Sequence, residues 1–356
     1  MSWIEVSKGI LMTVGWAFVV FSLIPLIRAN AWYIRIFDYP RSQKFWCSSA
    51  IFVAFLPFAD WTNRTDLVFL CALFLNIVYL GTQIWDYTPL ATCQMKKNTH
   101  ADAEGIRCFI SNVFQDNTNF HLCFDLIKKH DPQIVLLVET DEKWKEQADK
   151  ALTEYKHRVL QPQDNTYGML LYSKIPIKSY SLRFLVDDDI PSITADICCH
   201  DGRTFRLYCL HPRPPVPKES PESTERDAEI LIIGKEARKC KLPVIVAGDL
   251  NDVAWSYTTN LFLKVSGLLD PRIGRGFFST FHADYRLFRW PLDHVFCSSH
   301  FYLFDLKRLP SVGSDHFPIL IEVGLMPEKV AENEKEVKEA DSDDLEVAEE
   351  KIEEAR

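Results

Sequence analysis

The sequence lacks the cysteine spacings that are typical of a disulfide-rich fold or of a zinc site. Its 356 residues include 10 cysteines, and the seven that follow residue 100 are scattered and odd in number. These seven are Cys108, Cys123, Cys198, Cys199, Cys209, Cys240 and Cys297. Because disulfides persist in oxidising compartments, this pattern argues against a disulfide framework and favours a reducing compartment.

The chain also lacks an excess of positive charge. It carries 40 Lys and Arg against 49 Asp and Glu, a formal net charge of −9. The charge is uneven: residues 1–100 carry +3, residues 101–326 carry −4 and residues 327–356 carry −8. Duplex nucleic acid is bound mainly through Lys and Arg that neutralise its phosphates, so this balance argues against a nucleic-acid-binding surface.

Two long runs near the N-terminus lack charged residues altogether. Gly9–Ile27 and Leu67–Trp85 each contain 19 residues without a charge. A helix of that length spans about 28 Å, close to the thickness of a bilayer core. The first run is long and no small-residue cleavage site follows it, which argues against a cleaved signal peptide. We therefore predict that residues 1–85 form a membrane anchor of two or three helices.

The number of crossings depends on Phe45–Ala59, which has only 15 uncharged residues and contains Pro57. This run could span the bilayer, re-enter it or lie at its surface. Basic residues lie between Arg28 and Lys44, and positively charged loops stay in the cytoplasm. With three crossings the C-terminal domain is cytoplasmic, and with two it lies outside. The unpaired cysteines favour the cytoplasm.

After the anchor, short apolar runs alternate with amphipathic stretches from Ile106 to Val323. Strands are predicted at 106–113, 133–139, 167–173, 191–198, 204–210, 243–248, 292–297, 302–306 and 317–323, and helices at 118–130, 141–153, 224–240 and 257–268. Many strands with a few helices and long loops indicate an α/β sandwich of two sheets. We predict a linker at 86–103, a folded domain at 104–324 and a disordered or marginally helical acidic tail at 325–356.

Polar residues follow several of the predicted strands at the point where each strand ends. Asn112 and Glu139 end two of the runs, Gly248-Asp249-Leu250-Asn251 ends a third, and Ser314-Asp315-His316 precedes the last. Side chains at strand ends tend to converge at one edge of a sheet. Carboxylate and amide oxygens suit Mg²⁺ or Mn²⁺, and a histidine beside them can transfer protons near neutral pH. This combination is suited to hydrolysing phosphate esters.

The ordered set of these motifs resembles the endonuclease/exonuclease/phosphatase superfamily. The matching segments are Ser111-Asn112-Val113, Leu137-Val138-Glu139-Thr140, His211-Pro212, Gly248-Asp249-Leu250-Asn251, Leu292-Asp293-His294-Val295 and Ser314-Asp315-His316. The resemblance covers Ile106 to Val323. It implies a four-layer α/β sandwich, in which two mainly antiparallel sheets are flanked by helices and the active site lies where the sheets open at one edge.

The resemblance also implies a divalent metal site. Glu139 resembles the principal metal ligand, Asp315 a further carboxylate of the metal shell, and Asn112 the amide that hydrogen-bonds beside the metal. Some nucleases of the superfamily have an acidic residue two places after this asparagine, where this chain has Phe114. The metal, Mg²⁺ or Mn²⁺, is therefore expected to depend more heavily on Glu139.

The remaining motif residues resemble catalytic groups of the superfamily. Asp249 resembles the residue that orients or deprotonates the attacking water, and Asn251 the amide that stabilises the transition state. His316 resembles the histidine beside the scissile phosphate, and Asp293 the carboxylate that orients it. His211 lies where some members have tyrosine and others histidine.

Four arginines are further candidates for binding the substrate. Arg213 follows the His-Pro pair, while Arg272, Arg275 and Arg289 surround a glycine-containing loop that precedes Asp293. Arginine forms bidentate contacts with phosphate, which makes these residues candidate phosphate ligands. A solvated surface charge is the alternative interpretation for each.

Three functions remain open from the sequence. The first is a membrane-anchored phosphatase or phosphodiesterase that acts on a lipid or a small phosphorylated metabolite, which the anchor and the acidic balance favour. The second is a metal-dependent nuclease, and the third is a catalytically silent membrane interaction module. Proteins of similar layout occur in bacteria, so we expect a multi-pass protein of the bacterial inner membrane.

Overall fold

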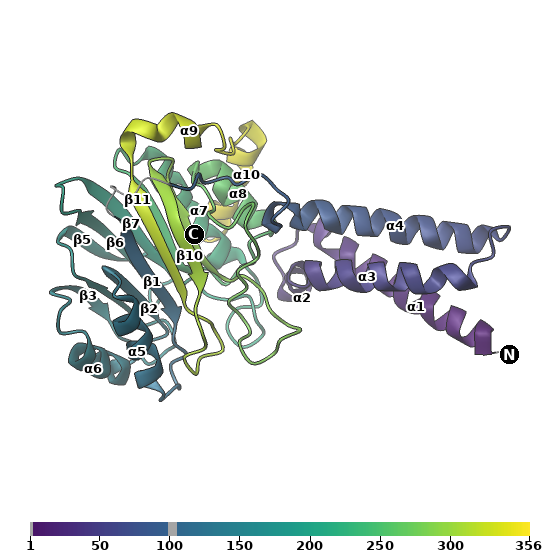
Figure 1. Ribbon diagram of the computed structural model, residues 1–356, viewed down its shortest axis with the longest axis horizontal. Helices are drawn as coiled ribbons and strands as arrows, with labels where there is room; N and C mark the ends of the chain where they lie inside the picture. Colours follow the sequence, from purple (N-terminus) through teal and green to yellow (C-terminus); the bar gives the residue numbers. More distant parts are fainter. Residues whose placement is uncertain (1–2, 99–104) are drawn as a thin grey trace.

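Three apolar helices extend side by side from one end of an α/β body in the computed structural model, which describes residues 3–98 and 105–356 (Figure 1). They are α1 (Trp3–Leu23), α3 (Arg41–Phe55) and α4 (Arg64–Ile84). Helix α1 runs toward the body, α3 runs away from it and α4 returns. By length and composition, two helical segments of the described chain could cross a membrane, Trp3–Ile27 and Arg64–Tyr87.

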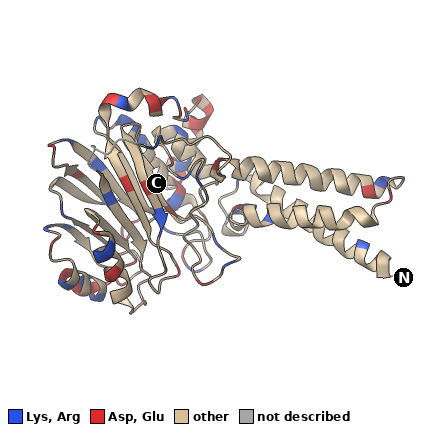
Figure 2. Cartoon of the chain, in the orientation of Figure 1, with Lys and Arg blue, Asp and Glu red and all other residues tan. Residues whose placement is uncertain are grey.

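The three helices pack on one another through a small apolar core. Phe55, Phe69 and Leu73 are completely buried between them, and α3 contacts both α1 and α4. Their outer surface is almost free of charge (Figure 2), because charged residues are absent from most of their length. On the inner side, Asn76 Nδ2 donates a hydrogen bond of 3.1 Å to Ser48 Oγ, while Asn76 Oδ1 has no partner among the described residues.

Two mixed sheets form the centre of the body. The first has the order β10-β11-β1-β2-β4-β3, and the second has the order β5-β6-β7-β8-β9. Their strands are β1 (Ile106–Asn112), β2 (Ile134–Val138), β3 (His157–Gln161), β4 (Met169–Ser173), β10 (Phe301–Arg308) and β11 (Ile319–Leu325) in the first sheet, and β5 (Ile177–Phe184), β6 (Pro191–Cys198), β7 (Thr204–Leu210), β8 (Val244–Asp249) and β9 (Asp293–Cys297) in the second. Strands β1 and β2 pair in parallel, as do β7 and β8, and the other pairs are antiparallel.

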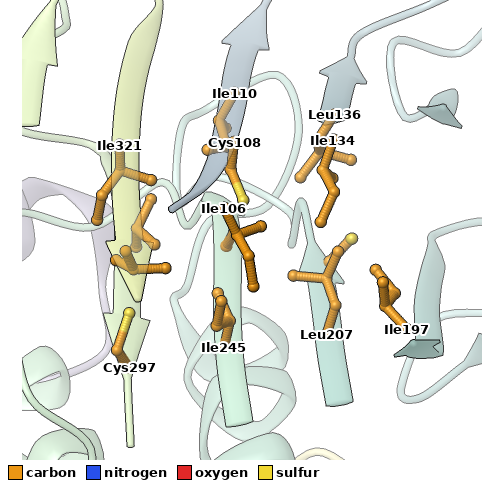
Figure 3. Close-up of a cluster of buried hydrophobic side chains, with 14 of the residues drawn as sticks. Ile106, Cys108, Ile110, Ile134, Leu136, Ile197, Leu207, Ile245, Cys297 and Ile321 are labelled. Carbon is orange, nitrogen blue, oxygen red and sulfur yellow. The ribbon is translucent and has the colours of Figure 1, made fainter. Parts of the chain in front are cut away.

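The main core lies between the inner faces of the two sheets (Figure 3). Ile110 and Leu136 of the first sheet meet Leu207 and Ile245 of the second in this core. Alternate residues of a strand point to opposite faces, so Phe109, the neighbour of Ile110, packs outward instead. Both faces of the central strands are therefore buried, which explains why these strands are almost continuously apolar.

Helices cover the outer faces of both sheets. On the first sheet lie α5 (Phe120–His130) and α6 (Glu142–Ala151), and on the second lie α7 (Thr224–Lys239) and α8 (Tyr257–Ser266). The order helix, sheet, sheet, helix confirms the predicted four-layer α/β sandwich. Strands β3 and β5 were not predicted, because each is an edge strand of its sheet and much of its surface is exposed.

The predicted linker at 86–103 is not a free connection in the part that the structure describes. Met95 is completely buried in the core between the sheets. Lys97 forms a bridge with Leu303 of β10, and Tyr87 packs beside Trp255. The sequence did not indicate these contacts, because isolated apolar residues in a polar stretch form no periodic pattern.

The acidic C-terminal segment is folded rather than disordered. Residues Val330–Glu334 form α9 and residues Ser342–Glu354 form α10. Ala348 and Ile352, four residues apart on one face of α10, are buried against α7 and α8. Composition suggested disorder, whereas these two apolar side chains and a capping box at Asp341 fix the helix.

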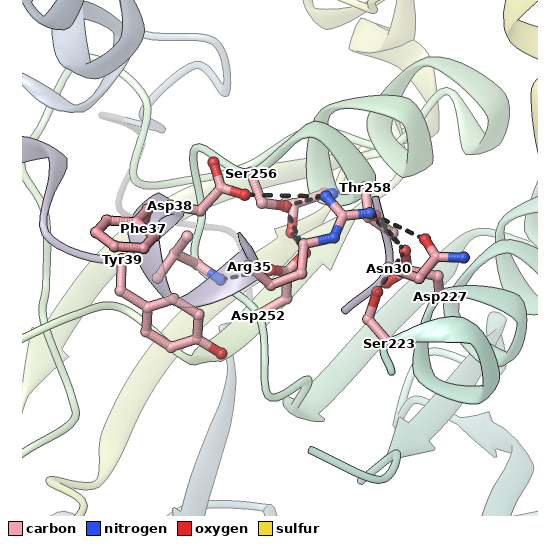
Figure 4. Close-up of polar contacts among 12 residues, drawn as sticks. Asn30, Arg35, Phe37, Asp38, Tyr39, Ser223, Asp227, Asp252, Ser256 and Thr258 are labelled. Carbon is pink, nitrogen blue, oxygen red and sulfur yellow. Dashed lines mark hydrogen bonds and ion pairs between the residues drawn. The ribbon is translucent and has the colours of Figure 1, made fainter. Parts of the chain in front are cut away.

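A buried ion-pair cluster joins the segment between α1 and α3, residues 24–40, to the body (Figure 4). Arg35, the last residue of α2 (Trp32–Arg35), donates to Asp227 Oδ2 of α7 at 3.2 Å. Lys351 of α10 donates to the same oxygen at 2.9 Å. Burial disfavours ionised Asp227, but the cations of Arg226, Lys351 and Arg35 outweigh it and hold the pKa of this carboxyl well below its usual range. Three distant segments of the chain are thus held at one point.

Candidate active site

The polar residues at the strand ends meet at one edge of the two sheets. Asn112 is the last residue of β1, and Glu139 follows the last residue of the parallel neighbour β2. Asp249 ends β8 and lies opposite Asp293, the first residue of β9. His316 lies in the loop that leads into β11. Pairing of the strands therefore brings five predicted site residues together.

Asn112 links the carboxylates of the two sheets. Its Nδ2 donates to Glu139 Oε1 at 2.6 Å and to Asp249 Oδ2 at 3.0 Å. Its Oδ1 accepts from the backbone N–H of Phe114 at 3.0 Å. Because both ends of the amide are engaged, Asn112 positions the two carboxylates and does not itself point an oxygen into the site.

His316 lies between two carboxylates in a buried setting. Its Nδ1 donates to Asp293 Oδ2 at 2.7 Å, and its Nε2 lies 3.5 Å from Asp249 Oδ2. Burial disfavours the charged imidazole, but the charges of Asp293 and Asp249 outweigh it and raise the pKa of His316 to about 10. The imidazole is therefore positively charged at neutral pH in this arrangement.

His211 and Glu139 face each other across the same site. His211 Nε2 lies 3.9 Å from Glu139 Oε1 and 3.9 Å from Asp249 Oδ2. Burial lowers the pKa of His211 to about 4, so this imidazole is neutral. Burial also raises the pKa of Glu139, to about 7, and that of Asp249. The two histidines thus differ in charge although they flank the same carboxylate.

The backbone of the site is strained at two of these positions. Glu139 has a φ of 59° and Asn251 a φ of 51°, both in the left-handed region. Such conformations cost free energy and occur often at functional sites. Gly248 has a φ of 145°, and a Cβ there would lie 1.9 Å from the carbonyl oxygen of Leu210. Only glycine allows β7 and β8 to approach this closely just before Asp249.

The loop after β8 is held in part by the segment between α1 and α3, residues 24–40. Asn251 Nδ2 donates to the carbonyl oxygen of Pro212 at 3.0 Å, and its N–H donates to Asp249 Oδ1 at 2.9 Å. The carbonyl oxygen of Asn251 accepts from the Tyr39 hydroxyl at 3.0 Å and from Arg226 Nη1 at 2.7 Å. Tyr39 is distant in sequence, and no sequence signal marked it as part of the site.

A family model described as Endonuclease/Exonuclease/phosphatase family matches residues 111–316. The chain belongs to this family. The matched range begins one residue before Asn112 and ends at His316, so it contains every site residue described above except Tyr39. Membership confirms the predicted superfamily and makes the protein a phosphoric ester hydrolase.

Solved structures of the same fold agree with the family. One is an endonuclease/exonuclease/phosphatase family protein from Bacteroides thetaiotaomicron, with 18% identity and a TM-score of 0.50, covering 64% of this chain and 97% of its own. Another is the catalytic domain of human Nocturnin, with 15% identity, a TM-score of 0.51 and coverage of 62% and 95%. A third is D. rerio TDP2 complexed with single-strand DNA product, with 13% identity, a TM-score of 0.52 and coverage of 62% and 99%. No curated protein matches the chain.

The site of this endonuclease/exonuclease/phosphatase protein has donors that fit a divalent cation. Potential ligand atoms of Glu139, His211 and Asp249 lie within 4.8 Å of one another, as do those of Asp249, Asp293 and His316. In the part of the chain described, Asp293 Oδ1 and His211 Nδ1 are buried without a hydrogen-bond partner. Burial raises the pKa values of Glu139 and Asp249, and a bound cation would stabilise the ionised form of both carboxyl groups. Oxygen donors with one neutral imidazole suit Mg²⁺ or Mn²⁺.

Asp315 lies outside these two groups of ligand atoms. Its side chain is partly exposed and accepts from Ser314 Oγ at 3.4 Å, and its backbone oxygen accepts from Ala283. Its charge still contributes to the raised pKa of Glu139. Asp315 therefore acts on the site mainly through its charge in this arrangement.

The guanidinium groups of the four arginine candidates are each held by local partners. Arg272 is only 2% exposed and its guanidinium is engaged by Asp270, which contradicts its expected role in binding substrate. Arg275 donates to backbone oxygens of Pro271 and Met95.

The other two arginines are partly exposed but are also engaged. Arg213 pairs with Asp187 at 3.3 Å and with Asp189 at 3.1 Å. Arg289 donates to the Ala283 carbonyl oxygen and lies over the ring of Phe317. The charges of Arg213 and Arg272 are compensated by carboxylates, whereas the partners of Arg275 and Arg289 only hold their guanidinium groups in place.

Two aromatic rings contact the site histidines and were missed in the sequence. The ring of Phe281 lies 4.9 Å from that of His316, and the ring of Tyr167 lies 5.5 Å from that of His211, between centroids. Phe281 comes from a loop, and Tyr167 lies at the start of the predicted strand 167–173, two residues before β4 begins. Neither could be distinguished from the other aromatic residues of the chain before the fold was known.

Proposed function

We propose that this protein is a membrane-anchored, divalent-metal-dependent phosphoesterase whose substrate is a lipid phosphate ester. The observation that carries the proposal is the hydrogen bond of 3.0 Å from the Tyr39 hydroxyl to the carbonyl oxygen of Asn251. Tyr39 lies two residues before α3, and Asn251 lies in the active-site loop. The start of an apolar helix is thus beside the reaction centre. If this helix crosses the bilayer, the active site lies at the bilayer surface, and the phosphate esters in its reach are those of lipids.

We propose further that all three apolar helices cross the bilayer. Helix α3 and the following 3₁₀ turn, Leu56–Phe58, together cover residues 41–58. At 1.5 Å per residue they span about 27 Å, compared with about 30 Å for a bilayer core, with Arg41 and Lys44 of the first turn at the cytoplasmic headgroups. At the far end of the bundle, Lys8 of α1 is paired with Asp66 of α4. Three crossings place the body on the same side as the basic residues 28–44, which is the cytoplasm.

A reporter at the C-terminus tests the side of the membrane. Arg356 is exposed at the end of α10, whereas a fusion within β11 would disrupt a buried strand. A GFP fused after Arg356 should fluoresce, and alkaline phosphatase fused at the same place should be inactive. The opposite result would place the body outside and would mean that α3 does not cross.

The residues of the site support an in-line hydrolysis. Water attacks phosphorus while the bond to the leaving oxygen breaks, and Asp249 is placed to accept the proton of the water. The charged His316 presents Nε2–H toward the site and can stabilise charge on a phosphoryl oxygen. Asp293 holds the opposite ring nitrogen and thereby orients the imidazole. The side-chain amide of Asn251 donates a hydrogen bond to the carbonyl oxygen of Pro212 and thereby fixes the loop after β8.

Glu139, with Asp249 and His211 as neighbours, would hold the divalent cation. A bound Mg²⁺ or Mn²⁺ supplies Lewis-acid stabilisation of charge on the phosphoryl group. Asn112 keeps the carboxylates of Glu139 and Asp249 in place, since it donates to both. Asp315 adds negative charge beside the same carboxylates.

The acidic character of the chain favours lipids over nucleic acids as substrates. The chain has a net charge of −9, and its candidate phosphate-binding arginines are paired with acidic or backbone groups. A nuclease remains the second candidate, because TDP2, a structure of similar fold, is complexed with single-strand DNA product. A small phosphorylated metabolite is the third candidate, since it needs no extended basic surface.

A substrate panel separates these candidates. The full chain in detergent is incubated with phosphatidic acid, with a dioleoyl phosphodiester lipid, with glucose 6-phosphate and with plasmid and single-stranded DNA, each with Mg²⁺ or Mn²⁺. We expect product release from a lipid, loss of activity in EDTA and at most trace activity in His316→Ala. DNA cleavage as fast as lipid hydrolysis, or full activity in EDTA, would contradict the proposal.

A further inference from the structure

A cavity of about 510 Å³ lies between the membrane-proximal segment, residues 24–40, and the body. That volume is within the range of small-molecule sites. The membrane-proximal segment contributes Trp32 and Ile36, the loop after β7 contributes Val216, and the loop before β9 contributes Phe288 and Trp290. These five lining side chains are hydrophobic.

Arg35 also lines the cavity, but it does not give the cavity a free charge. Its guanidinium donates to Asp227 at 3.2 Å and to Asn30 at 3.4 Å, within the buried cluster that joins α2 to α7 (Figure 4). A cavity with apolar walls and a compensated cation is suited to a hydrocarbon ligand. Arg35 Nε and Trp290 Nε1 are buried there without a hydrogen-bond partner among the described residues. A ligand with few polar atoms fits these walls, whereas most polar groups of a sugar or a nucleotide base would remain without partners.

The cavity shares a wall with the active site. Phe281 lines the cavity, and its ring lies 4.9 Å from that of His316 between centroids. Tyr39 also lines the cavity, and its hydroxyl donates to the active-site loop at Asn251. A phosphate held beside His316 therefore has an apolar space next to it, within the reach of a chain attached to its ester oxygen.

Residues 32–40, several of which line the cavity, lie where the apolar helices leave the body (Figure 1). Gln43, near the start of α3, donates to the backbone oxygen of Leu287 at 3.1 Å and so joins α3 to the loop before β9. Leu287 and Phe288 of that loop are 78% and 58% exposed, and Ile27, just before α2, is 64% exposed. These exposed apolar residues place the cavity at the level of the membrane surface.

We propose that this cavity binds a hydrocarbon chain of the lipid whose phosphate is hydrolysed at His316 and Asp249. The inference rests on the proposed function and adds how the substrate is recognised. The chain passes from the bilayer past Phe288 into the cavity, while the phosphate remains at the strand ends. Each methylene that is removed from water contributes about 0.8 kcal/mol, which corresponds to about fourfold in affinity.

A pair of esters with one reacting group tests the inference. Methyl p-nitrophenyl phosphate and hexadecyl p-nitrophenyl phosphate both release p-nitrophenolate, and both are presented to the full chain in mixed detergent micelles. We expect kcat/KM to be at least about a hundredfold higher for the hexadecyl ester. Hydrolysis of both esters at equal kcat/KM would overturn the inference and leave the proposed esterase intact.

Filling the cavity should remove the preference for the long chain. Val216 is 41% exposed at the rim, so Val216→Trp can be accommodated in a folded protein. Leu122→Trp on α5, where Leu122 is 39% exposed, is the matched control away from the cavity. We expect Val216→Trp to lower kcat/KM for the hexadecyl ester at least tenfold and to leave the methyl ester within twofold. An equal loss for both esters, or the same loss in Leu122→Trp, would overturn the inference.

Crosslinking provides a readout that does not depend on turnover. Hexadecyl phosphate with a diazirine at the end of its chain is photolysed with the full chain in EDTA, and the labelled peptides are identified by mass spectrometry. We expect labels within 215–217 and 288–290 that decrease in Val216→Trp. Labels confined to α1, α3 and α4 would show that the chain stays in the micelle, which would refute the cavity assignment. Labelled cavity peptides without turnover of any ester would instead refute the esterase.

Discussion

Replacement of Glu229 by glutamine should stabilise the protein at alkaline pH. Glu229 lies on α7, is 2% exposed, and its Oε1 has no hydrogen-bond partner among the described residues. Burial raises the pKa of this carboxyl from 4.5 to about 8, and the nearby charge of Asp187 adds to the shift. The group is therefore protonated in the folded chain at neutral pH, whereas it is ionised in the unfolded chain.

The sign and size of the effect follow from this difference. Between pH 4.5 and 8 the folded chain holds a proton on Glu229 that the unfolded chain has released, so the free energy of unfolding falls as the pH rises. At roughly 1.4 kcal/mol per pKa unit, the wild type loses about 3 kcal/mol between pH 5.5 and 8 from this group. Glu229→Gln has a similar shape and lacks this loss.

Thermal unfolding of the full chain in detergent, at pH 5.5 and at pH 8, measures the effect. The melting temperature of Glu229→Gln relative to wild type should rise by about 6 to 12 °C between the two pH values, since 1 kcal/mol corresponds to about 2 to 4 °C for domains of this size. Glu350→Gln, which removes an exposed carboxylate of α10, is the control and should follow wild type. Parallel curves for wild type and Glu229→Gln would refute the reasoning.

The site and the junction give three further predictions. Glu139→Ala should bind Mn²⁺ at least about tenfold more weakly by titration calorimetry while it keeps its circular dichroism spectrum, and unchanged binding would exclude this residue as a ligand. His316→Ala and Asp249→Asn should each lower kcat at least about a hundredfold, and Asp293→Asn should cost less because it acts through His316; full activity of His316→Ala would contradict both parts. Arg35→Ala removes one cation from the buried junction and should lower the free energy of unfolding by about 3 kcal/mol, measured by thermal unfolding. An unchanged value would show that the pair of Arg35 and Asp227 makes no net contribution to stability.

Most of the candidate site could be read from the sequence because its residues lie in short motifs at strand ends. Asn112, Glu139, Asp249 and His316 each follow or precede an apolar run, and strand pairing brings such ends to one edge. The motifs do not show which partners each side chain has in the folded protein. Arg272 lies in the same region of the sequence as the motif around Asp293, yet its charge is used within the fold by Asp270.

Contacts between distant segments were not predictable, because each depends on the complete fold. The Tyr39 hydroxyl meets the backbone of Asn251, and Met95 enters the core between the sheets, although neither residue belongs to a periodic pattern. The docking of α10 depends on Ala348 and Ile352, two apolar side chains in a segment whose composition is otherwise charged.

The sequence by itself determined the apolar helices, the two-sheet sandwich and the identity of the polar groups at its edge. The helices and strands are predictable from hydrophobic periodicity, because that periodicity depends only on residues close together in the sequence. Only the tertiary structure decided the charge states of His211 and His316, the hydrogen-bond and ion-pair partners of the arginines, and the cavity beside the site. Burial and the distance between charges are properties of the assembled chain, because they depend on which distant side chains exclude water from one another.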